Sequence, residues 1–500
     1  CIWKSCRGLR GQQAACSAFL GFSGRRLVMH RAVASRLAVL KEWSSSFARG
    51  HPPKDVALPS SSPDYVGSND TQITTLANGV KVASETLAGH TTSIGLYVNC
   101  GSVYETSGSF GASVLLERMA FKTTTNRSSS RIKRELEAIG GDSVASASRE
   151  QMGYTFVAMM TDVPAMVELL IDCVRNPVFL DWEVNKQLQN VKDQILEVSN
   201  NPHAVLMEAV HSTGYSGALA NPLLAHESAI NDLNCENLKD FFSKNYTAPR
   251  MVLAASGFEH GELLSIAEPL LVGMSFGPTP EEPKSFYVGG DYRCHVDSKS
   301  THFALAFEVP GGWRDLKEAV TLIVLQMLMG QSCSFYADGP RKGMFSRLYR
   351  CFLNEHRDIE SFSTFKNIYN NTGIFGIQAT TSPNFVQKAI QLSARELNSF
   401  TKPGEVDQMM LNFAKQSTKS FMLMNMESRV IACGDIGKQI LTYGERKPAE
   451  QFMEVVEGVT ASDIVSVAQR LLSSPLTMAS YGDVANVPSY ESVCNMFSCW

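Results

Sequence analysis

The order of strand-like and helix-like segments in this 500-residue chain occurs twice, and this repetition constrains the fold more than any other feature. The apolar run at 94–99 has a counterpart at 303–308, and the run at 251–257 has one at 476–482. A long helical pattern opens at Glu183-Val184 and again at Glu405-Val406. Self-similarity at a separation of about 210–225 residues indicates duplication of a whole domain, not an array of short repeats. We therefore predict two related halves.

Within each half, local patterns predict both strands and helices. After the segment 51–70, two strands are predicted to form a hairpin with its turn at Asn78-Gly79, a dipeptide that favours a tight turn between antiparallel strands. A strand at 250–256 closes the first half, and helical periodicity predicts helices at 110–122, 130–139, 163–175, 181–199, 202–213, 259–272 and 319–329. Strand and helix blocks joined by hairpins indicate the α+β class, with each half a mainly antiparallel sheet covered by helices.

Composition sets the boundaries of these halves. Residues 273–291 are rich in glycine and proline and are predicted to form a linker. The two domains are therefore expected at 71–272 and 292–500. Residues 51–70 are rich in proline and serine and are predicted to be a second linker, which joins the first domain to the N-terminal segment.

The N-terminal segment 1–50 has the composition of a targeting leader. It contains nine lysines and arginines and one acidic residue, Glu42, and it is rich in serine and alanine. Val33, Leu37 and Leu40 form an apolar stripe at helical spacing beside two arginines. An acid-poor, Arg-rich amphipathic leader is typical of an organellar transit peptide. The alternative interpretation is a disordered basic tail.

Bulk composition excludes several classes of protein. Mean hydropathy is −0.08, and no uninterrupted apolar run approaches the roughly 18 residues of a membrane-spanning helix, so any membrane association is expected to be through partner proteins. The twelve cysteines contain no CxxC pair and favour reduced thiols over a disulfide scaffold. From residue 71 onward, 45 acidic residues face 35 basic ones. This acidic body argues against nucleic acid and suits a basic peptide partner. The alternative is that an excess of ten acidic residues over this length is ordinary for a soluble protein.

One segment of the first half has the form of a zinc-binding helix without its ligands. The inverted zinc motif H-x-x-E-H places two histidines one helical turn apart and a glutamate that polarises the metal-bound water. In the segment 114–122 only Glu117 matches the motif, because Val114 and Arg118 occupy the two histidine positions. A valine cannot ligate zinc and a guanidinium repels it, so this helix is predicted to hold no metal.

The other histidines do not supply a replacement. His203 and His211 share one side of a predicted helix, but they lie about 12 Å apart at 1.5 Å per residue. One ion cannot be shared over that distance. Both are therefore predicted to be surface or packing residues.

Longer runs of sequence resemble a known family. The runs are 71–79, 115–122, 145–151, 247–257, 325–330 and 439–448. Together they resemble the pitrilysin-like metallopeptidase family, and within it the α-subunit group of the mitochondrial processing peptidases, most closely those of plants. The resemblance spans residues 71–490 and implies two related halves that close on each other like a shell.

The resemblance also implies a division of labour between two chains. In that family the β subunit carries the complete zinc motif, whereas the α subunit lacks it and is taken to help hold the presequence. Glu197 is near the place of the family's third zinc ligand, but one or two carboxylates cannot make a zinc site that normally uses three protein ligands. We therefore expect no catalytic residue and no cofactor in this chain, and zinc in a β-subunit partner. Val114 departs even from the plant relatives, which are expected to keep histidine there.

A second candidate site is the segment 330–344, a loop after the buried helix 319–329. It resembles the glycine-rich loop of the α subunits, which is thought to contact the presequence. The residues that fit the pattern, and are therefore the expected substrate-binding residues, are Gly330, Ser334, Phe335, Ala337, Gly339, Pro340, Lys342 and Gly343. Glycines of the pattern are replaced at Gln331, Ser332 and Cys333, and Asp338 and Arg341 also depart from it. The alternative is an inert surface loop.

The expected function is a non-catalytic subunit that binds the presequences of imported precursors for cleavage by a zinc-bearing β subunit. The leader at 1–50 would then be a mitochondrial transit peptide, and the mature chain would lie in the matrix or on the matrix side of the inner membrane. Three alternatives remain open: a structural core subunit of the respiratory cytochrome bc1 complex, a diverged paralogue that has lost peptide binding, and a self-sufficient zinc protease. The last is disfavoured by the ligand count.

Overall fold

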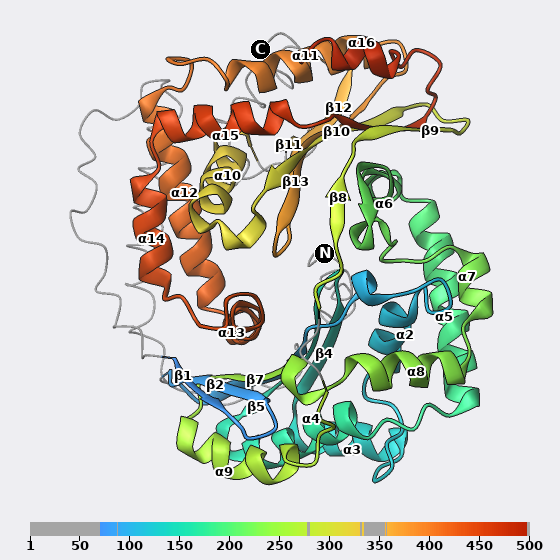
Figure 1. Cartoon of the computed structure of the whole chain (residues 1–500), viewed down its shortest axis with the longest axis vertical. Helices are drawn as coiled ribbons and strands as arrows, with labels where there is room; N and C mark the ends of the chain where they lie inside the picture. The colour runs from blue at the N-terminus through green and yellow to red at the C-terminus, as the bar shows by residue number, and fades with distance from the viewer. Residues whose placement is uncertain are drawn as a thin grey trace, which may run out of the picture. The chain divides into compact units, whose positions relative to one another are not determined.

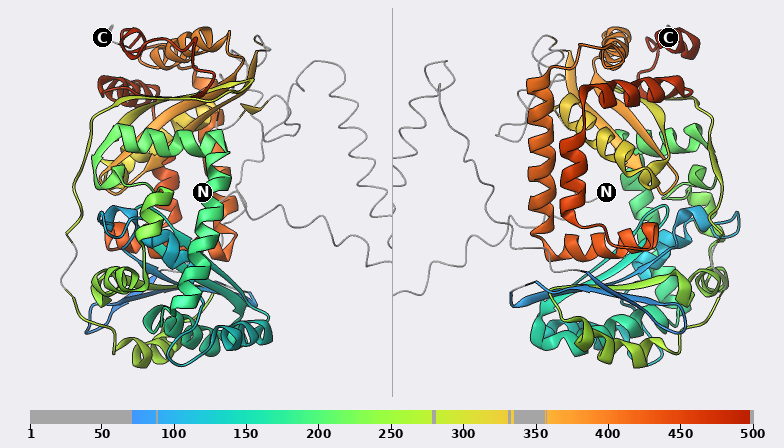
Figure 2. Two further views of the ribbon diagram at one scale, coloured as in Figure 1. Left: turned by 90° about the vertical axis from the view of Figure 1, so that its right-hand side faces the viewer. Right: turned by 60° about the vertical axis from the view of Figure 1, so that its left-hand side comes forward.

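The computed structural model describes residues 71–87, 89–277, 281–330, 333–334, 356 and 358–497 (Figures 1 and 2). The predicted leader at 1–50 and the predicted linker at 51–70 lie outside these residues. In the part of the chain that the structure describes, no helix combines the length and the apolar character needed to cross a membrane.

The first half is built on a six-stranded, mainly antiparallel sheet with the order β1-β2-β7-β3-β5-β4. Its strands are β1 (Gln72–Thr75), β2 (Lys81–Glu85), β3 (Thr91–Val98), β4 (Asp142–Ala147), β5 (Met152–Met159) and β7 (Met251–Ser256). The predicted hairpin is confirmed, since Thr75 pairs with Lys81 across the turn and Gly79 has a φ of 93°. The one parallel pair is β2 with β7.

Helices cover this sheet and form its core with it. They are α2 (Ala112–Met119), α3 (Ser129–Ile139), α4 (Val163–Arg175), α5 (Asp181–Ser199), α6 (Pro202–Gly214), α7 (Glu227–Asp232), α8 (Cys235–Asn245) and α9 (His260–Leu271). The predicted helices at 163–175 and 181–199 have the observed bounds. The helix predicted at 110–122 is shorter than expected, because Gly111 and Phe121 adopt left-handed conformations on either side of it.

The second half repeats this architecture with the strand order β11-β12-β13-β10-β14-β9. Its strands are β9 (Gly290–His295), β10 (Thr301–Pro310), β11 (Cys333–Ser334), β12 (Ile359–Ile368), β13 (Thr372–Thr381) and β14 (Thr477–Gly482). Its helices are α10 (Leu316–Met329), α11 (Val386–Ser399), α12 (Gln408–Met426), α13 (Arg429–Tyr443), α14 (Ala449–Gly458), α15 (Ala461–Ser473) and α16 (Tyr490–Cys494). The start expected at Glu405 for α12 is wrong by three residues, because the Asp407 side chain caps the helix.

The strand pairings confirm the duplication. In the first sheet β3 lies between β5 and β7, and in the second β10 lies between β13 and β14. Ile94 pairs with Phe156 and Ala255, and its counterpart Phe303 pairs with Ala379 and Ser480. Each sheet also has one parallel pair, which joins its last strand in sequence to an early one. The predicted α+β class with two related, helix-covered sheets is therefore confirmed.

Each half contributes one helix that packs on the sheet of the other half. The helix α13 of the second half packs on β3 and β7, where Cys433, Ile436 and Ile440 meet Tyr97 and Val252. The helix α6 of the first half packs on β9, β10 and β14 of the second sheet, so each sheet is covered on one face by a helix from the other half.

Polar contacts also join the two halves. The Arg446 guanidinium from the second half lies 3.1 Å from a Glu85 carboxylate oxygen of the first. The backbone N–H of Asn370 donates to the Glu150 carboxylate at 3.1 Å. Burial raises the pKa of Glu150 to about 7. Because these bonds join residues far apart in sequence, they fix how the two described sheets pack together.

The segment predicted as a linker at 273–291 is partly a strand. Residues 285–287 form β8, which pairs with β6 (Tyr215–Gly217), and β9 begins at Gly290. Residues 278–280 lie outside the described residues. The domain boundaries at 272 and 292 stay a prediction.

Candidate functional site

A buried carboxylate caps the start of α2, the helix that carries the degenerate zinc motif. Glu105 lies in the turn before α2 and is 5% exposed. Its two oxygens accept the backbone N–H groups of Gly111 and Ser113, both at 2.8 Å. Burial raises the pKa of Glu105 to about 7, against the effect of these hydrogen bonds. The sequence analysis missed this residue, because a cap that reaches back from six to eight residues upstream has no simple sequence pattern.

The motif positions on α2 face different environments. Val114 is 4% exposed and packs in the main core of the first half. Glu117 is half-buried, and burial raises the pKa of its carboxyl while Arg118 opposes the rise. Arg118 is exposed and its Nη2 donates to Gln194 Oε1 on α5 at 2.7 Å. A guanidinium therefore faces α5 at the position where the zinc motif has its second histidine.

Glu197, the fourth predicted position of the degenerate zinc motif, lies on α5, the helix that also carries Gln194. Glu197 is exposed on α5, three residues after Gln194. The structure thus brings the Arg118 end of α2 close to the part of α5 that bears Glu197, whereas Val114 points into the core. Among the described residues, no group of three or more His, Cys, Asp or Glu side chains could hold a metal ion. The residues present at this site do not fit a zinc ion.

We expect the purified chain to hold no stoichiometric zinc after a chelator wash, because a valine and an arginine occupy the ligand positions. Metal analysis by mass spectrometry, with Glu117→Gln as the matched variant, measures this. One zinc per chain that is lost in the Glu117→Gln variant would contradict the prediction.

The cap on α2 predicts a stability effect. Replacing Glu105 with alanine leaves two buried N–H groups without an acceptor, so the free energy of unfolding should fall by about 1–3 kcal/mol. Glu105→Gln keeps one acceptor oxygen and should cost less. Denaturant unfolding of the three proteins tests the order; equal midpoints would show that the Glu105 carboxylate does not support α2.

The end strand β4 lies beside α2 and exposes alternate residues. Along β4 the exposed positions are Asp142, Val144 and Ser146. The strand pairs with β5 on one side and ends the strand order of its sheet. A backbone hydrogen bond from Ala147 to the Glu117 carboxylate opposes the rise that burial causes in the pKa of Glu117, and this bond places the end of β4 at the motif. An end strand of this kind can pair with an extended peptide.

Only part of the second candidate site lies in the described residues. Gly330 ends α10 with a φ of 115°, is buried, and its carbonyl accepts the Thr364 hydroxyl at 2.9 Å. The backbone of Ser334 lies in β11, which pairs Ser334 with Ser361. The remaining predicted contact residues, Phe335, Ala337, Gly339, Pro340, Lys342 and Gly343, lie outside the described residues. Their role as substrate contacts stays a prediction.

His203 and His211 on α6 are a surface residue and a packing residue, as the sequence analysis predicts. His211 is 1% exposed, and its ring nitrogens lie 2.6 Å from the Met207 carbonyl and 2.7 Å from the Tyr369 hydroxyl. Burial lowers the pKa of His211 to about 3. It is a packing residue in the contact between the halves, while His203 is exposed and its ring lies edge-on to His302.

Comparison with known proteins identifies the family of the chain. The family described as "Insulinase (Peptidase family M16)" matches residues 81–227, and "Peptidase M16 inactive domain" matches residues 232–417. The chain is 60% identical over 446 residues to "Mitochondrial-processing peptidase subunit alpha" of Solanum tuberosum, covering 89% of this chain and 88% of the relative. It is 56% identical over 442 residues to "Probable mitochondrial-processing peptidase subunit alpha-2, chloroplastic/mitochondrial" of Arabidopsis thaliana, covering 88% of each.

A solved structure has the same fold. A chain of "Complex III2 from Candida albicans, Inz-5 bound" superposes with a TM-score of 0.73 at 20% identity, covering 85% of this chain and 99% of that chain. Because the identity is low, this likeness shows the fold alone. The matches to the relatives extend over nearly nine-tenths of both sequences, so the chain belongs to the M16 family of peptidases, and the resemblance to its mitochondrial-processing α subunits is confirmed.

Proposed function

We propose that this chain is a non-catalytic subunit of a mitochondrial processing peptidase, which binds presequences for cleavage by a zinc-bearing β subunit. The observation that carries the proposal is α2, where Val114 packs in the core and Arg118 donates to Gln194 at the two positions that the zinc motif gives to histidine. The relatives are named as α subunits of such an enzyme. A chain with this helix can contribute binding but needs another subunit's metal for hydrolysis.

Two features support binding of a basic, extended peptide. From residue 71 onward the chain has ten more acidic than basic residues, which favours association with the arginine-rich leaders of imported proteins. Among the residues that the structure describes, β4 stands at the end of the strand order of its sheet and lies next to Glu117. A peptide paired with β4 would be fixed by main-chain hydrogen bonds, so its side chains could vary widely.

The domain arrangement proposed for this function follows from the sequence. Residues 1–50 would be a mitochondrial transit peptide and 51–70 a linker. Peptidase-like domains would occupy 71–272 and 292–500, joined by 273–291. The mature chain would act in the matrix or on the matrix side of the inner membrane, with presequence peptides and the β subunit as partners.

The segment 330–344 provides the test of substrate binding. We expect deletion of Ser332–Lys342, in the chain reconstituted with the β subunit, to keep the heterodimer and weaken presequence binding. Fluorescence anisotropy with a labelled presequence peptide measures binding, and size-exclusion chromatography measures assembly. Restoring glycine at Gln331, Ser332 and Cys333 is the matched variant and should raise processing if processing requires backbone freedom there, because glycine restricts the backbone less than these residues do. Unchanged binding and turnover after deletion would overturn the substrate role of the loop.

A structural role in the respiratory cytochrome bc1 complex remains a second proposal. The fold likeness to a chain of Complex III2 is compatible with it. Native gel separation of mitochondrial complexes, followed by detection of this chain, distinguishes a processing heterodimer from a subunit of a larger membrane complex.

A further inference from the structure

Residues 118–134, which run from the end of α2 into α3, concentrate positive charge in an otherwise acidic body. This stretch contains six lysines and arginines and no acidic residue, whereas residues 71–500 as a whole contain ten more acidic than basic residues. All four arginines of the stretch donate to oxygen atoms of other residues: Arg118, Arg127, Arg131 and Arg134. The two lysines, Lys122 and Lys133, remain to be explained.

The residue after Lys122 joins three elements through hydrogen bonds. The Thr123 hydroxyl donates to Glu183 at the start of α5 at 2.8 Å, and it accepts the backbone N–H of Ser129 at the start of α3 at 3.2 Å. The Thr123 carbonyl accepts the backbone N–H of Val178, which lies just before α5, at 3.1 Å. The turn after α2 and the starts of α3 and α5 therefore meet at Thr123.

Three lysines surround this junction. Lys122 directly precedes Thr123, and Lys133 and Lys186 each lie one turn after the residue of α3 or α5 that bonds Thr123. Residues one turn apart share a helix face. Burial lowers the pKa of Lys122, and the positive charges of Lys133 and Lys186 lower it further. We refer to Lys122, Lys133 and Lys186 as the lysine cluster.

The described part of the chain supplies the lysine cluster with no direct counter-ion. Among these residues, none of the three ammonium groups has a hydrogen bond or an ion pair. The nearest carboxylate is already engaged, because Glu183 is 3% exposed and accepts both the backbone N–H and the hydroxyl of Thr123. Glu137 on α3 and Asp181 on α5 are exposed and form no ion pair with the cluster in the described residues. Three positive charges thus face one carboxylate.

Solvation explains only part of this arrangement. Lys133 and Lys186 are exposed and can be hydrated, but Lys122 is half-buried. Placing like charges together around a half-buried ammonium group is unfavourable unless a ligand supplies negative charge. Lysine ammonium groups act as compact point charges and bind phosphate oxygens well, whereas recognition of a carboxylate favours the planar fork of arginine. An oxyanion with two negative charges would balance the excess of two positive charges.

We propose that the lysine cluster binds an oxyanion of the phosphate class, either free phosphate or the phosphate group of a phospholipid. A bound phosphate would bridge the turn after α2 to α3 and α5, and would therefore stabilise the first half. The proposal does not depend on the proposed function, because the cluster contains none of the four positions of the degenerate zinc motif and no residue of the segment 330–344.

The test is calorimetric titration of the full chain with inorganic phosphate at constant ionic strength. We expect one saturable site with a dissociation constant of about 1 mM or below. The variant Lys133→Gln/Lys186→Gln removes two charged donors and should weaken binding at least about tenfold. The matched control is Lys284→Gln/Lys299→Gln, which removes two exposed lysines outside the cluster and should bind phosphate as the unmodified chain does.

Thermal unfolding separates a binding effect from misfolding. Without phosphate, Lys133→Gln/Lys186→Gln should melt no lower than the unmodified chain, because it removes repulsion between like charges. Phosphate should raise the melting temperature of the unmodified chain and of the control, but not that of this variant. Equal phosphate binding by the variant and the unmodified chain would overturn the proposal.

Vesicles distinguish the two sources of the phosphate group. Co-sedimentation with vesicles of phosphatidic acid in phosphatidylcholine, compared with pure phosphatidylcholine, reports binding to a lipid phosphate. Sedimentation that requires Lys133 and Lys186 and is competed by free phosphate would assign the site to a headgroup. Saturable phosphate binding without vesicle binding would assign it to a soluble phosphate. A chain that binds neither phosphate nor these vesicles would overturn the proposal and leave the proposed function intact.

Discussion

Replacing Gly437 with alanine should lower the free energy of unfolding by about 1–3 kcal/mol, because the new methyl group collides with a ring that cannot move freely. Gly437 lies on α13, and a Cβ built there would come within 2.1 Å of Tyr97 Cδ2 on β3. The Tyr97 hydroxyl lies 2.9 Å from Thr155 Oγ1 and 3.6 Å from Cys433 Sγ, which fixes the ring from both halves. The collision therefore acts on the contact through which α13 covers the first sheet.

The matched control for this variant lies one turn earlier on the same helix. A Cβ at Gly434 would come no closer than 3.6 Å, to the Tyr97 hydroxyl, which is an ordinary contact. Since alanine favours a helix interior over glycine, Gly434→Ala should be neutral or stabilise by up to about 1 kcal/mol. Urea unfolding of both variants gives the comparison. Equal effects at the two glycines would show that α13 does not pack against Tyr97 in solution.

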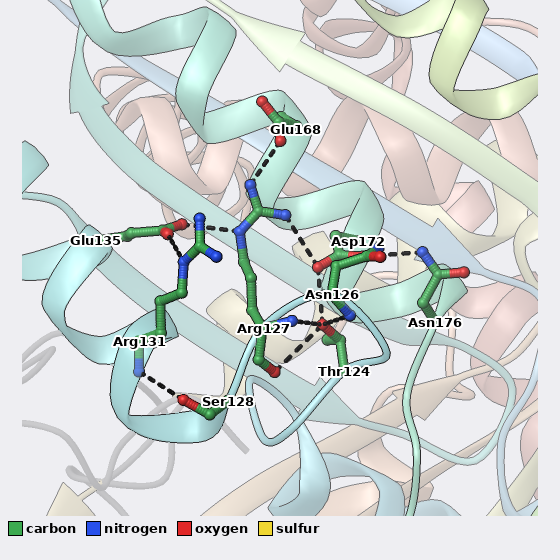
Figure 3. A network of polar contacts seen from close by, with 9 residues as sticks. All are labelled: Thr124, Asn126, Arg127, Ser128, Arg131, Glu135, Glu168, Asp172 and Asn176. Atoms are coloured by element: carbon green, nitrogen blue, oxygen red, sulfur yellow. Dashed lines mark hydrogen bonds and ion pairs between the residues drawn. The ribbon is translucent and has the colours of Figure 1, made fainter.

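Replacing Arg127 with methionine should cost roughly 3–5 kcal/mol, because it leaves partly buried carboxylates without their cation. Figure 3 shows Arg127 between three acidic side chains. Its nitrogens lie 3.0 Å from Asp172, 2.9 Å from Glu135 and 2.5 Å from Glu168. The side chains of Arg127 and Asp172 are 12% and 5% exposed. This network joins the turn after α2 to α3 and α4, so its loss should loosen the support of the motif helix.

The neighbouring Arg131 is the control for the Arg127 variant. Its Nε lies 2.6 Å from Glu135, but its side chain is 56% exposed. A surface pair of this kind is worth about 0–1 kcal/mol, so Arg131→Met should change stability little. Both variants can be compared by guanidinium unfolding at pH 7. Similar losses of unfolding free energy in the two variants would indicate that the Arg127 contacts stabilise the fold no more than a surface ion pair does.

The Arg127 network also predicts a pH dependence. Burial acts to raise the pKa of Asp172, but hydrogen bonds from Asn176, Asn126, Thr124 and Arg127 prevail and hold it below its ordinary value. A carboxyl with a depressed pKa in the folded state stabilises the protein above its unfolded pKa, and this contribution is lost as pH falls through the folded pKa. The acid limb of the stability curve should therefore be shallower in the Arg127→Met variant.

Much of the fold could be predicted from sequence because its elements carry local signals. The helices at 163–175 and 181–199 have a strong 3.6-residue apolar period, and the turn at Asn78-Gly79 requires a residue that tolerates positive φ. The duplication was visible because the central strands β3 and β10 and the strands β7 and β14 that pair with them kept similar apolar runs. These are properties of short segments, which sequence patterns report directly.

The exchange of α6 and α13 between the halves was not predicted, because no local pattern states which sheet a helix covers. The contacts that fix it, such as Tyr97 with Gly437 and His211 with Tyr369, join residues more than 150 positions apart. In the candidate site, too, some features have a local sequence pattern and others depend on contacts between distant residues. The loss of zinc ligands at Val114 and Arg118 could be read from a five-residue motif, whereas the Glu105 cap and the Arg118–Gln194 contact depend on tertiary structure.

We propose that this chain binds a presequence but depends on the metal of another subunit to cleave it. The most direct measurement combines metal content and cleavage of a presequence peptide for the chain alone, for the zinc-bearing β subunit alone, and for the reconstituted pair. We predict no zinc and no cleavage for the chain alone, one zinc per heterodimer, and cleavage by the pair that is lost when the β-subunit ligands are replaced. Zinc-dependent cleavage by the chain alone would contradict the account.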